Sequence, residues 1–276
     1  MKRRWFLIGL ALPVISVGCQ ALTSVISLRM SGNQTDTADG NEEDGVDVQI
    51  ARNDKTLVMA TAANYPPYEQ AEGEGEDRQI VGFDIDLAKL IAERLGRQLS
   101  IVDVDFGAII PTVSNDEVDM AMAALEPNRK RKQRVDFSNI YYRSRQSLIS
   151  LDGYLRSRDL NYQSVGIRAG SVQARFADRL NADYPDLNVM AYDTLEEIFE
   201  ALDIGAIEGA ILEANVATSY LRRYPDFAAN VMPSDRPTGS AIALPKNSPL
   251  RRDINAAITD IKSSGEMNRL IVQWFS

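Results

Sequence analysis

The sequence contains no histidine and only one cysteine, Cys19. Without histidine, zinc and copper sites lose their most common ligand and a Ser-His-Asp triad loses its base, so we expect no metal and no other cofactor. One cysteine cannot form a disulfide within the chain. Positive charge is also scarce, because 30 basic residues stand against 39 acidic ones. The resulting net charge of −9 predicts a soluble surface that repels nucleic acid.

The sequence has no apolar run long enough to span a bilayer, and its most apolar segment is a short one close to the start. Three positive charges at residues 2–4 precede an apolar run that is too short to span a bilayer, and small residues come before Cys19. This order is typical of a secretory signal peptide. It resembles a bacterial lipoprotein signal, in which the cysteine after the cleavage site carries lipid. Removal of the three charges would take the net charge to −12.

We therefore expect a signal over residues 1–19, lipidation at Cys19, and a lipoprotein anchored to a membrane in the periplasm or at the cell surface. Two alternatives are an uncleaved membrane anchor and a cysteine buried in an ordinary first helix. Residues 3–7 also resemble a twin-arginine export signal, so the export route, Sec or twin-arginine, stays open. Residues 20–54 are polar, acidic and poor in large apolar side chains, which predicts a flexible linker.

From Lys55 onward, short apolar runs alternate with helical periods. Strands are predicted over 57–60, 99–102 and 118–123. Residues 84–96 form an amphipathic helix pattern that ends in a glycine, and a capping box opens a helix over 194–204. Ser248 is predicted as the N-cap, before the first-turn proline Pro249, of a helix that ends near 263. Strands that alternate with helices predict an α/β fold with largely parallel sheets.

Three segments carry the most information about function. The first is Tyr65-Pro66-Pro67-Tyr68-Glu69, followed by Val81-Gly82-Phe83-Asp84. The second begins at Phe106-Gly107-Ala108 and continues through Leu125-Glu126-Pro127-Asn128-Arg129-Lys130-Arg131, and the third is Val165-Gly166-Ile167-Arg168-Ala169-Gly170-Ser171. In this order and spacing they resemble the extracellular solute-binding proteins of family 3, the periplasmic binding proteins of polar amino-acid ABC importers. The resemblance extends from about Leu57 to Phe275.

The resemblance implies a type II periplasmic binding protein fold, with two α/β lobes joined by two crossing strands at a hinge. Lobe one would comprise residues 55–143 and 238–276, and lobe two residues 144–237. A polar amino acid would bind in the cleft between the lobes and be delivered to an inner-membrane ABC permease. We expect the protein to act as a monomer and to catalyse no reaction.

A free amino acid presents a carboxylate and an ammonium group, and a buried carboxylate is best held by a bidentate guanidinium. By resemblance, Arg131 occupies the carboxylate-binding position, although its basic neighbours also allow a solvated charge. Gly170 and Ser171 open a helix whose free N–H groups favour an anion, and plain N-capping is compatible with that role. Glu213 follows an apolar strand where the family usually carries Asp, and would hold the ammonium group.

The remaining candidates concern the side chain of the ligand. Tyr65 and Phe106 match the family's aromatic pair, and aromatic faces attract cations; core packing is the alternative for Phe106. The loop that carries Ala124 and Glu126 is expected to border the cleft, and Val172 stands where the family often has Thr. An acid at Glu126 favours a basic amino acid, followed by a neutral polar one, and disfavours dicarboxylates. The alternative is that Glu126 pairs with a neighbouring arginine.

Two other functions remain to be weighed against transport. Some relatives of this family are dehydratases of prephenate-like substrates, in which a cleft acid protonates a leaving hydroxyl, and Glu213 or Glu126 could serve if burial raised its pKa. A sensor domain is the other possibility, but we see no transmembrane or signalling segment after the α/β pattern.

Overall fold

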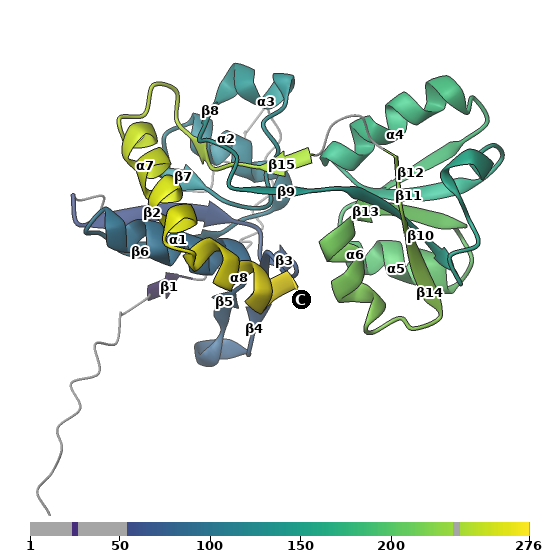
Figure 1. Cartoon of the computed structure of the whole chain (residues 1–276), viewed down its shortest axis with the longest axis horizontal. Coiled ribbons are helices and arrows are strands. Elements are labelled where there is room, and N and C mark those ends of the chain that lie inside the picture. Colours follow the sequence, from purple (N-terminus) through teal and green to yellow (C-terminus); the bar gives the residue numbers. More distant parts are fainter. Residues whose placement is uncertain (1–23, 27–53, 234–237, 276) are drawn as a thin grey trace, which may run out of the picture.

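The structure, a computed structural model, describes residues 24–26, 54–233 and 238–275. Two α/β lobes lie side by side and are joined by two extended strands (Figure 1). These strands, β9 (Tyr142–Ser144) and β15 (Thr238–Ser240), pair antiparallel to each other. The two expected crossovers are therefore present, and the fold is the two-lobed α/β architecture.

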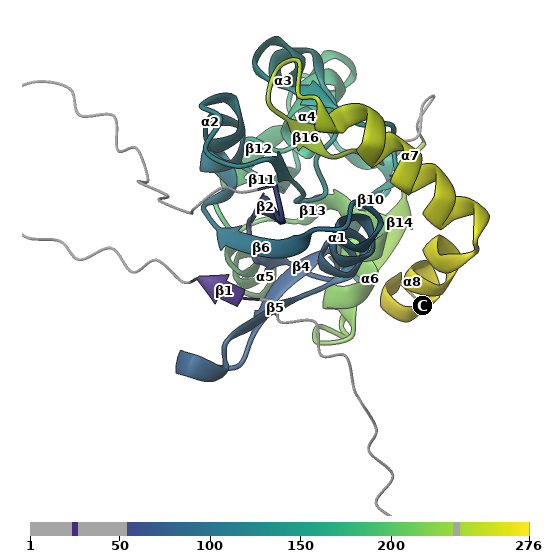
Figure 2. The same ribbon diagram turned by 90° about the vertical axis from the view of Figure 1, so that its left-hand side faces the viewer.

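Lobe one is built on a sheet with the strand order β1-β6-β2-β7-β16-β8. Its strands are β1 (Ser24–Ile26), β2 (Thr56–Thr61), β6 (Gln98–Asp103), β7 (Met120–Ala121), β8 (Asp136–Phe137) and β16 (Ala243–Leu244). Its α-helices are α1 (Phe83–Arg94), α2 (Ile109–Ser114), α3 (Arg129–Arg134), α7 (Leu250–Ser263) and α8 (Glu266–Phe275). Figure 2 shows α7 and α8 on the opposite side of this lobe from β1.

The centre of this sheet is parallel and is buried on both faces. Strand β2 pairs parallel to β6 and β7, and Leu57 and Met59 belong to one core cluster while Val58 and Ala60 belong to another. Successive side chains of a strand point to opposite faces, so β2 is covered on each side. A small antiparallel sheet of β3 (Asn64–Tyr65), β4 (Glu69–Glu72) and β5 (Gln79–Val81) follows β2.

Lobe two has the strand order β12-β11-β13-β10-β14. Its strands are β10 (Gln146–Leu151), β11 (Ser164–Arg168), β12 (Asn188–Tyr192), β13 (Gly209–Glu213) and β14 (Phe227–Val231). Its α-helices are α4 (Val172–Asp183), α5 (Leu195–Asp203) and α6 (Ala214–Leu221). Strands β11, β12 and β13 are parallel, but β10 runs antiparallel to both β13 and β14. The expected parallel character holds only for the βαβ part, because β10 enters directly from the crossing strand β9.

Most predicted elements lie where the sequence places them. Helix α1 ends at Arg94 and is followed by Gly96 with φ of 66°, the left-handed conformation that suits a residue after a helix. The capping box of Thr194 and Glu197 at α5 is formed by both of its hydrogen bonds. The strand predicted over 118–123 is shorter, since β7 covers only two residues. The prediction that Ser248 caps α7 is wrong, because Pro249 takes the cap position and no side chain caps that helix.

Three further predictions concern the region before lobe one: the signal segment, the lipidated Cys19 and the linker. The structure places β1 inside the segment predicted as a linker, where it pairs parallel to the edge of β6. The signal segment and Cys19 lie outside the described residues. In the part of the chain that is described, no helix combines the length and the apolar character needed to cross a bilayer.

Candidate functional site

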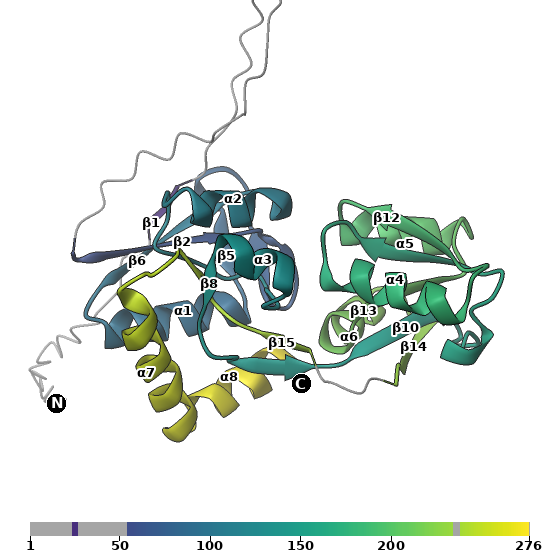
Figure 3. The same ribbon diagram turned by 90° about the horizontal axis from the view of Figure 1, so that it is seen from above.

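A small cavity lies between the two lobes, at the carboxyl ends of several strands. Helix α3 of lobe one and helix α4 of lobe two face each other across this region (Figure 3). Seven of the nine predicted ligand-binding residues line the cavity together with three others; the full lining is Tyr65, Phe106, Ala123, Ala124, Arg131, Arg168, Ser171, Val172, Gln173 and Glu213. Ligands of open α/β sheets bind at this end of the strands.

Arg131 lies in α3 and is held by backbone carbonyl groups. Its guanidinium donates to the carbonyl of Glu126 at 3.1 Å and, across the cleft, to the carbonyl of Gly170 at 3.4 Å. The side chain of Asn128 caps α3 by accepting from the backbone N–H of Arg131 at 2.8 Å. Burial and, to a smaller extent, the charge of Arg175 lower the pKa of Arg131 to about 10. Arg131 is therefore a buried, ionised group at neutral pH, with donors available to a carboxylate.

The start of α4 lies on the lobe-two side of the cavity. Gly170 has φ of 65° and turns the chain from β11 into α4, where Ser171 accepts from the backbone N–H of Ala174 at 3.3 Å. Ser171 is therefore an N-cap residue, as one of the two predictions for it stated. Because the first N–H groups of a helix lack partners within the helix, this end of α4 also favours an anion. Both roles are compatible in one residue.

Glu213 ends β13 and lies directly before α6. It is 6% exposed, and its carboxylate accepts a hydrogen bond from the hydroxyl of Tyr68 in lobe one. Burial raises the pKa of Glu213 from 4.5 to about 7, while the hydrogen bond from Tyr68 opposes that rise. An ammonium group beside Glu213 would restore the ionised form, because opposite charges stabilise each other.

The loop that carries Tyr65 and Tyr68 packs against the start of α1. Gly82 has φ of 141°, and a Cβ atom there would lie 2.1 Å from the carbonyl oxygen of Tyr68. The backbone N–H groups of Phe83 and Asp84 donate to the carbonyls of Pro67 and Tyr68. Glycine at position 82 thus allows the close approach that places Tyr65 at the cavity.

Ala124 lines the cavity in a strained backbone conformation. Its φ is 48°, which costs free energy for any residue with a Cβ. Its N–H donates to the Asp84 carboxylate at 2.9 Å, and the hydroxyl of Tyr141 donates to the same carboxylate at 2.7 Å. Asp84 is fully buried, and burial raises its pKa to about 7. Asp84 therefore holds the loop that shapes this wall of the cavity.

We expect Asp84→Ala to lower the free energy of unfolding by about 2–5 kcal/mol, because each buried donor left without its acceptor costs about 1–3 kcal/mol. Urea unfolding would measure the change, with Glu93→Ala on the exposed side of α1 as the control. A loss no larger than that of the control would show that Asp84 does not hold this loop.

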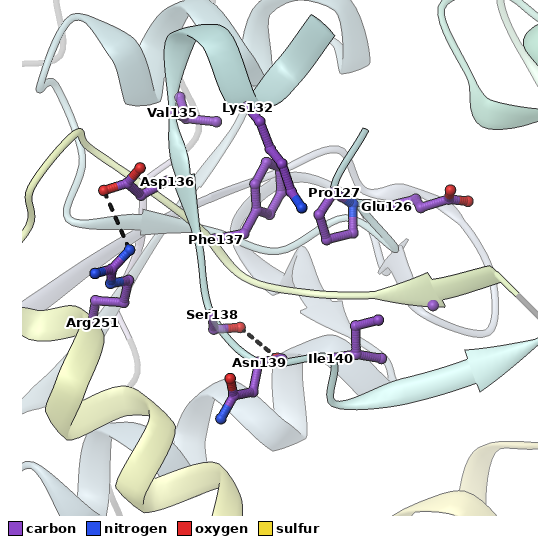
Figure 4. A pocket seen from close by; sticks show the side chains of 11 residues that line it. Glu126, Pro127, Lys132, Val135, Asp136, Phe137, Ser138, Asn139, Ile140 and Arg251 are labelled. Atoms are coloured by element: carbon purple, nitrogen blue, oxygen red, sulfur yellow. Dashed lines mark hydrogen bonds and ion pairs between the residues drawn. The ribbon is translucent and has the colours of Figure 1, made fainter. Parts of the chain in front are cut away.

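Glu126 does not line the same cavity. It lies instead at the end of a neighbouring groove of about 600 Å³ in lobe one, where its carboxylate points away from Lys132 and Phe137 (Figure 4). One of its carboxylate oxygens is buried without a hydrogen-bond partner among the described residues. Burial raises the pKa of Glu126, and the charges of Arg175, Arg131 and Arg179 oppose this rise. Glu126 therefore faces the arginines of α4 as well as Arg131.

Two polar residues of the cavity were not predicted as ligand contacts. Gln173 is buried and donates to the side chain of Gln146 at 2.9 Å. Arg168 is the last residue of β11, and its guanidinium lies 4.2 Å from the centre of the Phe106 ring and 5.2 Å from that of Tyr65. The sequence signal that could have identified Arg168 is a charged residue at the carboxyl end of an apolar strand, where ligands of such sheets bind.

Comparison with known proteins agrees with this geometry. Residues 57–276 match the family described as bacterial extracellular solute-binding proteins, family 3. The arginine-binding extracellular protein ArtP of Bacillus subtilis is 31% identical over 226 residues, which cover 80% of this chain and 87% of that protein.

Solved structures give the same result. A crystal structure of the substrate-binding protein of an amino acid ABC transporter is similar with a TM-score of 0.73 and 34% identity, over 80% of this chain and 99% of that one. An ancestral arginine-binding protein bound to arginine is similar with a TM-score of 0.72 and 29% identity, over the same shares of the two chains. With a family match over most of its length, the chain belongs to the bacterial extracellular solute-binding proteins of family 3.

Proposed function

We propose that the protein is the extracytoplasmic receptor of an amino-acid ABC importer and that its preferred ligand is a basic amino acid. In this proposal Arg131 and the start of α4 bind the α-carboxylate, and Glu213 binds the α-ammonium group. Tyr65 and Phe106, named here the aromatic clamp, hold the cationic side chain. An inner-membrane permease would then accept the amino acid from the receptor.

The observation that supports this most directly is the composition of one cavity. It brings a buried arginine, a buried acid and two aromatic rings together from both lobes. The aromatic clamp also lies within cation–π distance of a guanidinium, that of Arg168. A clamp that accepts one guanidinium is suited to the side chain of arginine. The names of two similar proteins, both arginine-binding, point to the same ligand.

A thermal-shift panel of the twenty amino acids, ornithine and citrulline tests this proposal. A ligand that binds only the folded state raises the melting temperature by mass action. Arginine, lysine and ornithine should give the largest increases, glutamine a smaller one, and aspartate and glutamate none. A largest shift with glutamate or with an apolar amino acid would contradict the proposed ligand class.

Glu126 should tune selectivity and not overall affinity. It lies beside the cavity and its charge is partly offset by three arginines, so its effect on a ligand is long-range. We expect Glu126→Gln to weaken arginine severalfold and glutamine hardly at all. Calorimetric titration of both ligands gives the ratio, with glutamine as the internal control. Equal effects on the two ligands would assign Glu126 a structural role.

We further propose that the protein is anchored by lipid on Cys19. Cys19→Ser should leave the binding domain folded but move it from the membrane fraction to the soluble fraction, because buried acyl chains provide the anchor. Fractionation of the host cells with an antibody against the domain measures this. If the wild-type protein is soluble, or if it retains residues 1–18, the lipoprotein proposal is wrong.

A dehydratase remains the second candidate because one observation favours it. Glu213 is a buried acid whose pKa of about 7 suits a general acid at neutral pH. We propose that the protein has no such activity, since the same residue serves the ammonium group of a ligand. Incubation of the purified chain with prephenate, followed by mass spectrometry, decides between them. Turnover that Glu213→Gln abolishes would establish the enzyme.

A further inference from the structure

The aromatic clamp is in contact with a residue of the opposite lobe. Arg168 belongs to lobe two, yet its guanidinium lies over the rings of both Phe106 and Tyr65 in lobe one. The Arg168 side chain is almost completely buried, since the residue is only 3% exposed. A cation this close to two rings is attracted to both of them. The contact therefore joins the lobes through the surfaces that the proposed function assigns to the side chain of the ligand.

Few polar contacts hold Arg168 in this place. One terminal nitrogen donates to the side-chain oxygen of Asn64 in lobe one at 2.7 Å. Its Nε has no hydrogen-bond partner within the described part of the chain, and none of the ion pairs found there involves Arg168. A guanidinium offers five N–H donors, and a buried cation with few of them satisfied is costly. The charges of Glu69 and Glu196 favour the ionised form of Arg168, but neither acid forms a direct ion pair with it. Arg168 is thus held by the two rings and by Asn64, and it can leave without breaking a direct ion pair.

The cavity is too small to admit a ligand side chain while Arg168 stays in the clamp. Its volume is about 20 Å³, room for roughly one water molecule. Arg131 also stands near the Phe106 ring, at 5.6 Å, so a third guanidinium beside these two would meet strong repulsion. Binding of a cationic side chain to the clamp therefore requires Arg168 to move out.

We propose that Arg168 is an internal competitor of the ligand: its guanidinium occupies the aromatic clamp until the side chain of a basic amino acid displaces it. This inference rests on the proposed function, because it takes the clamp as the site of the ligand's side chain. The apparent affinity for such a ligand is then reduced by the fraction of molecules in which Arg168 fills the clamp. Only a ligand side chain that binds the clamp strongly enough to displace Arg168 is then accepted by the site.

The competitor has a second consequence for the free protein. Its contacts with Phe106, Tyr65 and Asn64 all cross the cleft, so they bring the lobes together without any ligand. Removal of Arg168 should shift the free protein toward more open arrangements, while a ligand should still close it. The affinity for the ligand and the shape of the free protein are therefore two independent measures of the contact between Arg168 and the aromatic clamp.

Calorimetric titration of the purified full chain with L-arginine and L-lysine tests the proposal. Arg168→Gln keeps a polar side chain but shortens it and removes the charge, and Arg158→Gln in the same lobe is the matched control, since that side chain is 83% exposed. Arg168→Gln should tighten the binding of arginine about tenfold, as expected for loss of one good cation–π competitor. Arg158→Gln should bind like the wild type.

Small-angle scattering of the same proteins without ligand gives the second measurement. The radius of gyration should be larger for Arg168→Gln than for the wild type and the control. If Arg168→Gln does not fold, Arg168→Lys serves instead, and its weaker hold on the clamp should change both quantities in the same direction. Scattering that is identical for all variants would overturn the role of Arg168 in joining the lobes.

The outcomes separate this inference from the proposed function. If the wild type binds arginine and the Arg168 variants bind it equally or more weakly, the internal competitor is wrong and the proposed function stands. If the wild type binds no basic amino acid, the ligand class fails and the inference fails with it. If the wild type binds glutamate and Arg168→Gln abolishes that binding, Arg168 is a direct contact of an anionic side chain, which overturns both.

Discussion

Arg131→Ala should abolish detectable micromolar binding of the amino acid while leaving the protein folded. Arg131 is only 8% exposed and donates to the backbone on both sides of the cleft. Removal of one partner from a buried, hydrogen-bonded ion contact typically costs about 3–5 kcal/mol, which corresponds to roughly two to four decades in the dissociation constant. Every α-amino acid should be affected, because the carboxylate is common to all of them.

Calorimetric titration with arginine and glutamine measures this loss, and circular dichroism checks the fold. Arg129→Ala is the matched control, since Arg129 lies in the same helix and its side chain is exposed. We expect the control to bind within a factor of about two of the wild type, as is usual for a screened surface charge. If Arg131→Ala binds with near-native affinity, the carboxylate site lies elsewhere, and the start of α4 becomes the main candidate.

The fold followed from local patterns wherever one segment contained its own signal. The capping box at Thr194 and the glycine at position 96 predicted the ends of two helices because these signals depend on neighbours within a turn. The antiparallel direction of β10 carried no such signal. It depends on the route of the chain through the crossing strand β9, and apolar runs are alike in parallel and antiparallel strands.

The candidate site was predictable to a similar degree. Tyr65, Arg131 and Glu213 come from short motifs, and the structure gathers them around one cavity. Arg168 was missed because its importance arises from a contact between lobes, with two rings more than sixty residues before it. Asp84 was missed for the same reason, since its partners Ala124 and Tyr141 lie far along the chain. Local sequence supplies residue types, whereas these roles depend on tertiary neighbours.

Binding of the amino acid should strengthen as the pH rises through about 7. Burial raises the pKa of Glu213 to about 7, so the carboxylate that we propose for the ligand's ammonium group is half protonated near neutrality. Between pH 6 and pH 8 the ionised fraction of Glu213 rises about tenfold, and the affinity should rise with it. The stability of the free protein should have the opposite pH dependence. A carboxyl with a raised pKa stabilises the fold below its ordinary value of 4.5 and loses that contribution as the pH rises through 7.

Glu213→Gln separates this effect from those of the neighbouring acids. Asp84, whose pKa is also raised to about 7, and Glu126 both act on Glu213 and remain in the variant. We expect Glu213→Gln to weaken binding by roughly two to four decades at pH 8 and to remove most of the pH dependence of what binding remains. Titrations at pH 6, 7 and 8 in buffers of different ionisation enthalpy would also show fewer protons released on binding by the variant. If Glu213→Gln keeps the wild-type pH profile, another acid titrates on binding, and Glu213 does not hold the ammonium group.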